Sequence, residues 1–534
     1  MKIKLTKGVF IMKKKNITLI CALAMAMTLT ACGQSSTTST NKAESTTVAE
    51  ASTTETTADN ETADTENDSE SSKAEAQTVG SDINSDDKKA EAPDGQTPPD
   101  KPDGAGGENG QGTPPDKPDG DGQGGPGGGS FGGSGEVTQG DSANTIDADG
   151  TYSSETYSST GDDENALRVD GATVTLDGIT VDKSAGSSSN TEDGDFYGMN
   201  AALLATDGAT VTIKNANVSS SAQNGNGVFS YGSGTTVNIS DSTITTTADN
   251  SGGIQTTGGG TTNASSLTVT TSGNSSAAIR SDRGGGTVNV DGGTYTSNGY
   301  NSPAVYSTAD ITVKNAELTA NNSEALVIEG ENSIALEDCT VYGNMSDTKG
   351  TSSDENVHNV MIYQSMSGDA EVGTSSFSMA GGSLTSNNGD MFYITNTNCT
   401  LSLTGVKLTN KDSDGYLLNV TGNSASHGWG SAGSNGAQVT FTADNQTLKG
   451  NIRVDSISTL DMTLSGNSTF TGTVNVVDNE DGGTAVSDNA VITIENGSTW
   501  NLTGNCVISS LTNNGTINFN GYTITLADGT VLSE

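Results

Sequence analysis

The chain has 534 residues and a formal net charge of −42, and only 31% of its residues are hydrophobic. Globular domains usually contain about 45–50% apolar residues, so one large conventional core over the whole length is excluded. Charged residues make up only 16%, and the polar bulk is Ser, Thr, Asn and 69 Gly, which favours a thin, repetitive β-structure with a narrow core. The acidic balance argues against nucleic-acid binding, because phosphate contacts need clustered Lys and Arg.

Residues 1–31 have the pattern of an export signal. Six lysines without an acidic residue precede and flank an apolar run, Ile17 to Leu29, that is too short to span a membrane comfortably. The run ends in Leu-Thr-Ala-Cys-Gly, which resembles a bacterial lipobox. The resemblance implies cleavage before Cys32 and a diacylglyceryl group on its sulfur, with Met1 or Met12 as the start. We expect a lipid-anchored protein exposed outside the cytoplasm; an ordinary secretory signal is the alternative.

Residues 32–144 have the composition of an unfolded tether. Residues 33–90 contain almost no large apolar side chain, and the sequence Thr-Pro-Pro-Asp-Lys-Pro-Asp-Gly occurs at Thr97 and again at Thr113. Such a segment cannot bury enough apolar surface to offset the chain entropy lost on folding. We therefore expect an acidic stalk of about 110 residues, with a Pro-rich docking ligand as the alternative.

From residue 145 to 534, a short pattern of two apolar residues separated by one other residue recurs. This period-2 alternation predicts short strands with one face inward, and a second and a third short strand accompany each copy. Thirteen copies align at intervals of 21–43 residues. They are Val174/Leu176, Val211/Ile213, Val237/Ile239, Leu267/Val269, Val288/Val290, Ile311/Val313, Ile334/Leu336, Phe377/Met379, Leu401/Leu403, Val439/Phe441, Leu460/Met462, Ile492/Ile494 and Ile517/Phe519.

Three short strands in a coil of roughly 22 residues are typical of a parallel β-helix. The region resembles the right-handed parallel β-helix superfamily, the pectin-lyase-like fold, as found in bacterial surface lipoproteins and adhesins. The resemblance implies an all-β solenoid of about thirteen coils, in which stacked coils share one core. It identifies the architecture well and the activity hardly at all.

The third strand of each coil predicts an outward face of mixed chemistry, because equivalent positions of successive coils lie about 4.8 Å apart. The inward row is apolar: Leu203, Val228, Ile254, Ile279, Val305, Leu326, Met361, Phe392 and Leu417. The neighbouring outward row is Leu204, Phe229, Gln255, Arg280, Tyr306, Val327, Ile362 and Tyr393. The next outward row is Thr206, Tyr231, Thr257, Asp282, Thr308, Glu329, Gln364 and Thr395.

Glycan binding uses aromatic rings that stack on sugar faces, with Arg and carboxylate groups for the hydroxyls. We therefore expect a ligand-binding face, walled by inserts at 343–356 and 421–436. The alternative is that loops cover the aromatic rings and that Arg280 has a structural ion pair with Asp282 or Glu329. The predicted ligand-binding residues are Phe229, Tyr231, Arg280, Asp282, Arg283, Tyr306, Glu329, Tyr393 and Trp429.

Catalysis stays open on this face, although the superfamily includes polysaccharide lyases and hydrolases. The galacturonase-like Asn-Thr-Asp, Gly-His-Gly and Arg-Ile-Lys motifs are absent, and so is the pectate-lyase-like Trp-x-x-Asp-His signature. Asp282 and Glu329 are weak catalytic candidates, because an inverting hydrolase needs carboxylates roughly 6.5–9.5 Å apart and these align two coils, roughly 10 Å, apart. No cofactor or metal site is assigned, and calcium at the acidic turns is left open.

The sequence thus predicts a lipid-anchored surface protein whose β-helix serves in adhesion or polysaccharide binding. A polysaccharide lyase or glycoside hydrolase on the same face is the first alternative. A structural or protein-binding surface rod is the second. The expected partners are a membrane, through the lipid, and a polysaccharide or host glycan; the oligomeric state is undetermined.

Overall fold

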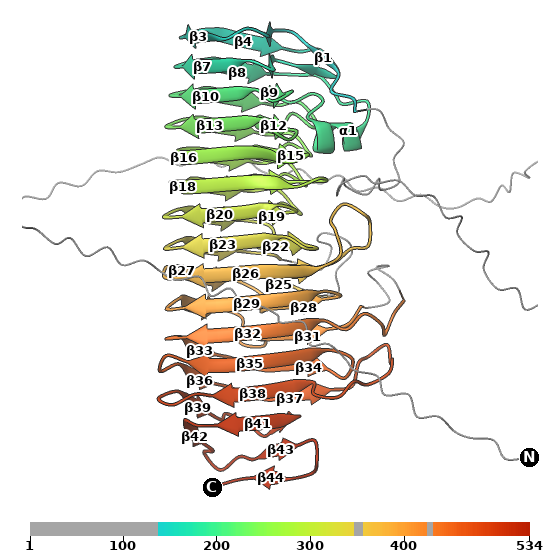
Figure 1. The fold of residues 1–534 in the computed structure, drawn as a ribbon, viewed down its shortest axis with the longest axis vertical. Coiled ribbons are helices and arrows are strands. Elements are labelled where there is room, and N and C mark those ends of the chain that lie inside the picture. Colours follow the sequence, from blue (N-terminus) through green and yellow to red (C-terminus); the bar gives the residue numbers. More distant parts are fainter. Residues whose placement is uncertain (1–136, 347–355, 424–430) are drawn as a thin grey trace, which may run out of the picture. The chain divides into compact units, whose positions relative to one another are not determined.

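The computed structural model describes residues 137–346, 356–423 and 431–534. Cys32, Trp429, the whole predicted signal and most of the predicted tether lie outside the described residues, as do the middles of both predicted inserts. The described part is a parallel β-helix, as predicted: its strands pair with those of neighbouring coils in long parallel sheets. Figure 1 shows the coils stacked in chain order, with α1 (Thr191–Tyr197) beside the early coils.

A sheet of 16 strands, called here the third-strand sheet, takes one strand from each successive coil. Only its last pairing, between β43 and β44, is antiparallel. Its strands are β2 (Thr145–Ile146), β6 (Leu167–Asp170), β9 (Leu203–Thr206), β12 (Val228–Tyr231), β15 (Ile254–Thr257), β17 (Ile279–Ser281), β19 (Val305–Ser307), β22 (Leu326–Glu329), β25 (His358–Tyr363), β28 (Asp390–Thr395), β31 (Leu418–Thr421), β34 (Ile452–Asp455), β37 (Val474–Val477), β40 (Cys506–Ile508), β43 (Ile524–Leu526) and β44 (Val531–Leu532).

A sheet of 22 strands contains the first and second strands of the coils, which are continuous in β16 and β18. The first strands are β3 (Gly150–Ser153), β7 (Thr173–Asp177), β10 (Thr210–Lys214), β13 (Thr236–Ser240), β16 (Gly260–Thr271), β18 (Gly286–Ser297), β20 (Asp310–Lys314), β23 (Ser333–Glu337), β26 (Thr374–Ala380), β29 (Asn398–Thr404), β32 (Gln438–Asp444), β35 (Thr459–Ser465), β38 (Ala490–Ile494) and β41 (Ser510–Asn513). The second strands are β4 (Thr156–Ser159), β8 (Thr180–Lys183), β11 (Asn217–Ser220), β14 (Thr243–Thr246), β21 (Glu317–Ala320), β24 (Thr340–Gly343), β27 (Ser383–Ser386) and β30 (Lys407–Asn410).

Two small sheets complete the described strands. The four-stranded one holds the second strands of the later coils, and the two-stranded one lies near the start of the described residues. Their members are β33 (Thr447–Lys449), β36 (Thr469–Thr471), β39 (Thr499–Asn501) and β42 (Thr516–Asn518), and then β1 (Asp141–Ser142) and β5 (Glu164–Asn165).

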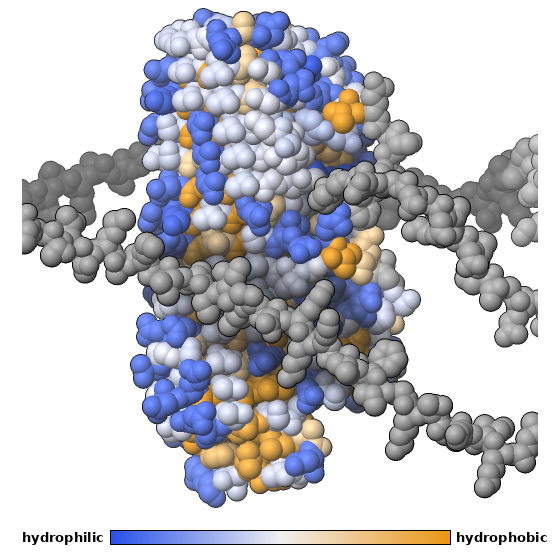
Figure 2. Space-filling view, viewed as in Figure 1, coloured by the Kyte–Doolittle hydropathy of each residue, from blue (hydrophilic) through white to orange (hydrophobic). Residues whose placement is uncertain are grey.

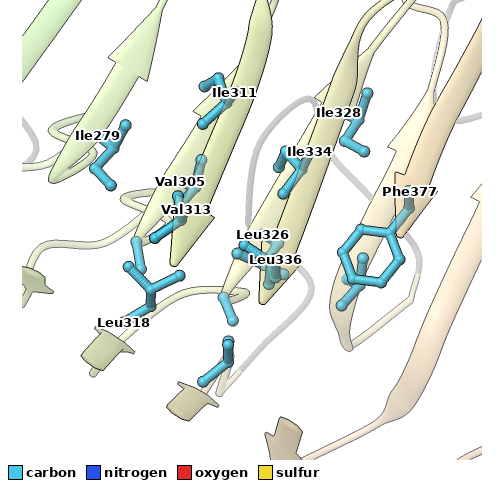
Figure 3. Close-up of a cluster of buried hydrophobic side chains, with 14 of the residues drawn as sticks. Ile279, Val305, Ile311, Val313, Leu318, Leu326, Ile328, Ile334, Leu336 and Phe377 are labelled. Atoms are coloured by element: carbon cyan, nitrogen blue, oxygen red, sulfur yellow. The ribbon is translucent and has the colours of Figure 1, made fainter. Parts of the chain in front are cut away.

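The core is one continuous cluster of inward side chains from all three strands of each coil. Figure 3 shows part of it, where Leu336 of a first strand lies beside Leu326 of the third-strand sheet, and Val313 beside Val305 in the same way. A single coil could not enclose these side chains, so each coil is buried by the coils on either side of it. Figure 2 shows an outer face on which hydrophilic and intermediate residues dominate, with hydrophobic residues gathering toward the C-terminal coils.

The bend between first and second strands needs a residue in the left-handed backbone region. Asn215, Asp241, Asn315 and Asp338 occupy it with φ between 51° and 53°. Asn and Asp enter this region more readily than other side chains, which explains their recurrence between the two strands. The side chains also bond between coils, as when Asn315 Nδ2 donates to Asp291 Oδ1 at 2.8 Å.

The predicted register of the third strand is correct as far as Leu326 and then slips. Leu326 pairs with Val360, which pairs with Phe392, so Val360 and not Met361 points inward. Met361 consequently takes the outward place predicted for Ile362, and Tyr363 takes the place predicted for Gln364. Every residue of β25 is buried, so its apolar pattern could not distinguish the two faces. Leu418 likewise replaces Leu417 as the inward partner of Phe392.

Four copies of the predicted repeat are misaligned. Val269 pairs with Ile244 of a second strand, and the first-strand pair of that coil is Thr262 and Ala264. Thr262 is buried with its hydroxyl 2.7 Å from that of Thr256, so a search for apolar residues passed over it. Ile517 likewise lies in a second strand, where it pairs with Trp500. The copies Val439/Phe441 and Leu460/Met462 are displaced by two residues within first strands, because Val439 pairs with Cys399 and Leu460 pairs with Val439.

Leu326→Ala should lower the free energy of unfolding by about 2–5 kcal/mol, because it removes buried methyl groups and leaves a cavity in the shared core. Thr312→Ala, at an outward position of β20, is the control and should change stability by less than about 1 kcal/mol. Urea denaturation followed by circular dichroism measures both. Similar losses for the two variants would contradict the inward register.

Candidate functional site

The pairings place the predicted site residues of the early coils in adjacent order. Phe229 pairs with Gln255, Gln255 with Arg280, and Arg280 with Tyr306. Asp282 and Glu329 occupy one row two coils apart, because each lies two residues after a residue that pairs with Tyr306, Arg280 and Val327 respectively. The predicted outward row therefore exists up to Val327, but its aromatic rings are not open to solvent in the way the ligand-face prediction required.

Helix α1 covers the first part of this row. Asn190 caps its N-terminus by accepting from the backbone N–H of Glu192, and Gly198 ends it with φ of 80°. Phe229 is fully buried against Leu204 beneath this segment. Phe229 is therefore a packing residue, and its predicted role in contacting a ligand is wrong because the insert that covers it was not recognised.

Polar side chains of the sheet hold α1 in place. Gln255 Nε2 donates to the carbonyl of Asp195 at 2.6 Å, and the hydroxyl of Thr257 donates to the carbonyl of Phe196 at 2.6 Å. Tyr231 is half-buried and packs edge-on against Tyr197, with ring centroids 5.7 Å apart. These contacts satisfy carbonyl groups of the short helix, which makes α1 a fixed part of this face.

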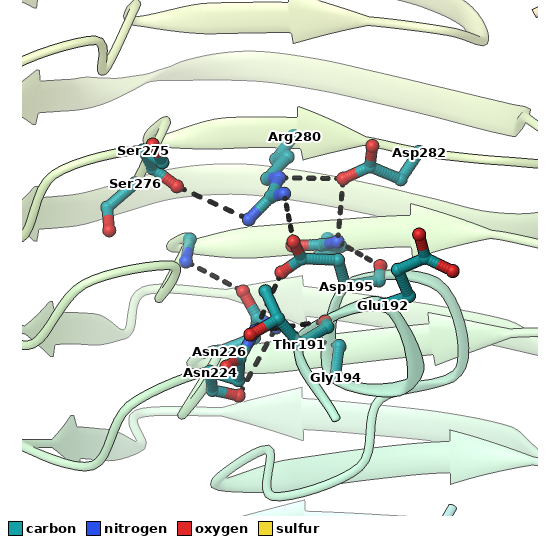
Figure 4. A network of polar contacts seen from close by, with 12 residues as sticks. Thr191, Glu192, Gly194, Asp195, Asn224, Asn226, Ser275, Ser276, Arg280 and Asp282 are labelled. Carbon is teal, nitrogen blue, oxygen red and sulfur yellow. Dashed lines mark hydrogen bonds and ion pairs between the residues drawn. The ribbon is translucent and has the colours of Figure 1, made fainter. Parts of the chain in front are cut away.

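Arg280 joins α1 to the sheet through two carboxylates. Its Nη2 lies 3.1 Å from Asp195 Oδ2 and its Nε lies 2.7 Å from Asp282 Oδ2, as Figure 4 shows. Its side chain is only 10% exposed, so the guanidinium is used for structure. The expected alternative of a pair with Asp282 is thus observed, whereas Asp195 was not anticipated.

The buried charges shift one another's protonation. Burial raises the pKa of Asp282 to about 7 against the opposing effect of Arg280, and the negative charges of Asp195, Asp369 and Glu329 add to the rise. Burial also raises the pKa of Asp195, again opposed by Arg280. Burial alone would lower the pKa of Arg280, but the two carboxylates raise it above its ordinary value. The cluster therefore has more negative than positive groups.

Glu329 accepts hydrogen bonds from three hydroxyl groups. Tyr306 OH donates at 2.6 Å and Tyr363 OH at 3.0 Å, and Ser365 Oγ donates as well. Burial, together with the charge of Glu329, raises the pKa of Tyr306 well above its ordinary value. Glu329 is 2% exposed, so this carboxylate is a buried acceptor that orients the two tyrosines.

Arg283 links α1 to the segment that follows β25. Its Nη2 lies 2.6 Å from Asp369 Oδ1, and its guanidinium stacks 4.1 Å from the ring centroid of Phe196. Neither contact was visible in the sequence, because Asp369 is 86 residues away and Phe196 lies in the unrecognised insert. Arg283 therefore connects α1 to the segment around Asp369 across this face of the sheet.

A pocket of about 220 Å³ lies between α1 and strands β17 and β19. Two carboxylates, an arginine and a half-buried tyrosine line it together with small, apolar and amide side chains. The lining residues are Asp195, Asn250, Ser275, Ala277, Arg280, Asp282, Asn301, Pro303 and Tyr306.

Tyr393 lies at a different place, in a groove of about 540 Å³ farther along the third-strand sheet. Tyr393 pairs with Asn419, which pairs with Arg453, so the outward row continues into the groove. Tyr393 itself is 4% exposed and stacks on His358 with ring centroids 5.1 Å apart. The lining residues are Asn356, Tyr393, Tyr416, Asn419, Thr421, Gly422, Arg453, Asn479, Glu480 and Asp481.

Hydrogen bonds fix the polar groups of this groove. Asp390 accepts from Asn419 Nδ2 at 2.9 Å and from the backbone N–H of Tyr416 at 2.7 Å, and burial raises its pKa. Asn419 Oδ1 in turn accepts from Arg453 Nη1 at 3.2 Å, and Arg453 Nη2 lies 3.3 Å from Glu480 Oε1. The sequence did not point to this groove, because the predicted outward row ended at Tyr393 and did not extend to Asn419 and Arg453.

Within the described ranges, no three His, Cys, Asp or Glu side chains are grouped so that they could hold a metal ion. The described part of the chain also contains no helix with the length and apolar character that crossing a membrane requires. Comparison of the sequence with protein-family models found no match, and comparison with curated proteins found none either. The fold and the two hollows on the third-strand sheet are therefore the observations on which a function must rest.

Asp282→Asn should change how stability depends on pH. The folded-state pKa of Asp282 is raised from 3.8 to about 7, so its contribution is fully present below 3.8 and is lost as pH rises through 7. The variant cannot gain this charge, so the difference in Tm, variant minus wild type, should be more positive at pH 8 than at pH 5. Thermal unfolding at both pH values measures it.

Asp461→Asn, which changes an exposed carboxylate on β35, is the control for that measurement and should follow the wild type at both pH values. The same pH dependence in Asp282→Asn and in the wild type would contradict the buried, proton-binding state of Asp282.

Proposed function

We propose that this protein binds a polysaccharide at the cell surface and that the groove along β28, β31 and β34 holds the sugar chain. The observation that supports this most is the groove's size of about 540 Å³ combined with its lining of tyrosine, amide, guanidinium and carboxylate groups. The pectin-lyase-like and adhesin-like resemblance of the sequence is consistent with this function. The absence of a matching family leaves the proposal resting on the site itself.

The groove has the chemistry that sugar hydroxyls need. Each hydroxyl both donates and accepts, and Asn479, Arg453 and Glu480 offer donors and acceptors side by side. Tyr416 is half-buried, so part of its ring is available for packing against a sugar face. The hydrogen bonds of Asp390 hold Asn419 in one orientation, and such pre-organisation lowers the entropy lost on binding.

The proposed surface location rests on the N-terminal sequence. A lipid on Cys32 would anchor the chain, and a tether of about 110 residues would span roughly 60 Å on average as a flexible coil. An acidic stalk of this length would let the β-helix reach a polysaccharide away from the membrane.

A lyase or hydrolase on the same face is the second candidate. The observation that favours it is the pKa of Asp282, about 7, since a carboxyl group that holds a proton near neutral pH can act as a general acid. Glu329 is less suited to be its partner, because three hydroxyl groups already donate to it. Release of reducing ends from a bound polysaccharide would distinguish the enzyme from the binder.

Arg453→Ala should weaken binding to the best ligand of a polysaccharide array by about tenfold, as the loss of about 1.4 kcal/mol would. Lys449→Ala, which removes an exposed cation from the neighbouring strand β33, is the matched control and should bind like the wild type. The full chain carrying Cys32→Ser is used so that it stays free of lipid. Equal affinity of Arg453→Ala and the wild type would refute a groove-bound ligand.

Cys32→Ser should move the protein from the membrane to the soluble fraction, because the sulfur that would carry the lipid is lost. Cys21→Ser, within the predicted signal, should leave the protein in the membrane fraction. Membrane fractionation and the mass of the N-terminal peptide test this. A membrane-bound Cys32→Ser protein would exclude lipidation at this position as the anchor.

A further inference from the structure

We propose that the pocket between α1, β17 and β19 binds the ammonium group of an unacetylated amino sugar, so that the ligand of this face is a glycan that contains such sugars. The inference rests on the proposed polysaccharide binding and names its substrate class. It concerns a site separate from the groove, because Arg280 and Tyr393 lie four coils apart in the third-strand sheet, which is about 19 Å.

The charges around the pocket are not balanced by the protein. Asp195 and Asp282 both face the single guanidinium of Arg280. Of the groups nearby, Glu329 and Asp369 add negative charge to the surroundings of Asp282, and Arg283 is paired with Asp369. Among the lining residues, two carboxylates thus face one arginine, and a cation in the pocket would be attracted because the surroundings are largely buried.

A buried hydrogen-bond acceptor without a donor lies behind the residues that line the pocket. Gln255 is fully buried beside Asp195 and Asp282. Its Nε2 donates to the backbone carbonyl of Asp195 and to the carboxylate Oδ2 of Asp282. Its Oε1 has no hydrogen-bond partner among the described residues. An ammonium group has three donors and no acceptor, so it suits a place where carboxylate and amide oxygens lack donors.

The walls of the pocket favour a sugar over a simple amine. Tyr306, Pro303 and Ala277 form an apolar side, and Asn250 and Asn301 supply amide groups. A sugar ring has an apolar face and a rim of hydroxyls, which matches both sides. The net charge of −42 adds a general preference, because it repels acidic glycans and attracts cationic ones.

Isothermal titration of the full chain carrying Cys32→Ser with two probes tests this inference. The probes are the β-1,4-linked glucosamine trimer and the corresponding N-acetylglucosamine trimer, at 50 mM salt and pH 7, because Asp282 is mostly protonated below its pKa of about 7. The glucosamine trimer should bind at least about tenfold more tightly than the acetylated trimer. Raising the salt to 500 mM should reduce this preference, because ion pairing is screened.

Two variants separate the pocket from the groove. Asp282→Asn should abolish the preference for the unacetylated trimer, since it removes one of the two facing carboxylates. Arg453→Ala lies in the separate groove and should leave the ratio of the two trimer affinities unchanged. Circular dichroism checks the folding of Asp282→Asn, and the salt dependence of the wild type stays informative if that variant does not fold.

Equal affinity of the two trimers for the wild type would overturn the proposal, and so would a preference that survives in Asp282→Asn or at 500 mM salt. Trilysine binding as tightly as the glucosamine trimer would also overturn it, because charge alone would then explain the affinity. If neutral polysaccharides bind and depend on Arg453 while the amine makes no difference, the proposed function stands and this inference fails. If neither trimer binds, this inference fails, and binding to the polysaccharide array then tests the proposed function separately.

Discussion

Each coil of this β-helix can bury its apolar side chains only against the coils on either side of it, and the rest of the structure depends on that constraint. In-register parallel pairing stacks the inward residues, such as Leu326 between Val305 and Val360. The same pairing aligns the outward residues into rows. Rows of outward side chains therefore arise from the fold alone. A row can form a binding site only where its side chains have suitable chemistry and the segments that pack over it leave them accessible. Polar rows are common on this β-helix. The two candidate sites lie where such a row includes an arginine, Arg280 on β17 and Arg453 on β34.

The β-helix itself could be predicted from the sequence because its cause is local. Alternating apolar residues, such as Val211 and Ile213, recur at each coil and predict the strand and its inward face. The prediction failed where the local pattern is ambiguous. Thr262 is polar yet buried, and β25 is buried on both faces, so the alignment skipped one and slipped by one residue in the other.

The candidate site could be predicted only in part, because its cover comes from distant segments. The row through Arg280 and Tyr306 was found from the repeat. The helix that supplies Asp195 lies in an insert without any repeat pattern, and its contacts span 60 residues or more. The groove around Arg453 was missed because the predicted outward row ended at Tyr393, and because Leu417 was taken as the inward partner of Phe392 in place of Leu418. Predicting exposure from a row thus requires knowledge of what packs over it.

The contacts of α1 and Arg283 also have a consequence for how the protein unfolds. In an ideal solenoid each coil interacts only with its neighbours, so coils can open one after another from an end. Here Phe196 bonds to Thr257 and stacks on Arg283, which is paired with Asp369. These links join coils that are not adjacent, so the middle of the solenoid should open as one cooperative block while the terminal coils fray independently. The pocket and the groove should therefore open differently. The pocket lies inside the cooperative block, whereas most of the groove lies in coils that follow Asp369, the last residue that these contacts join.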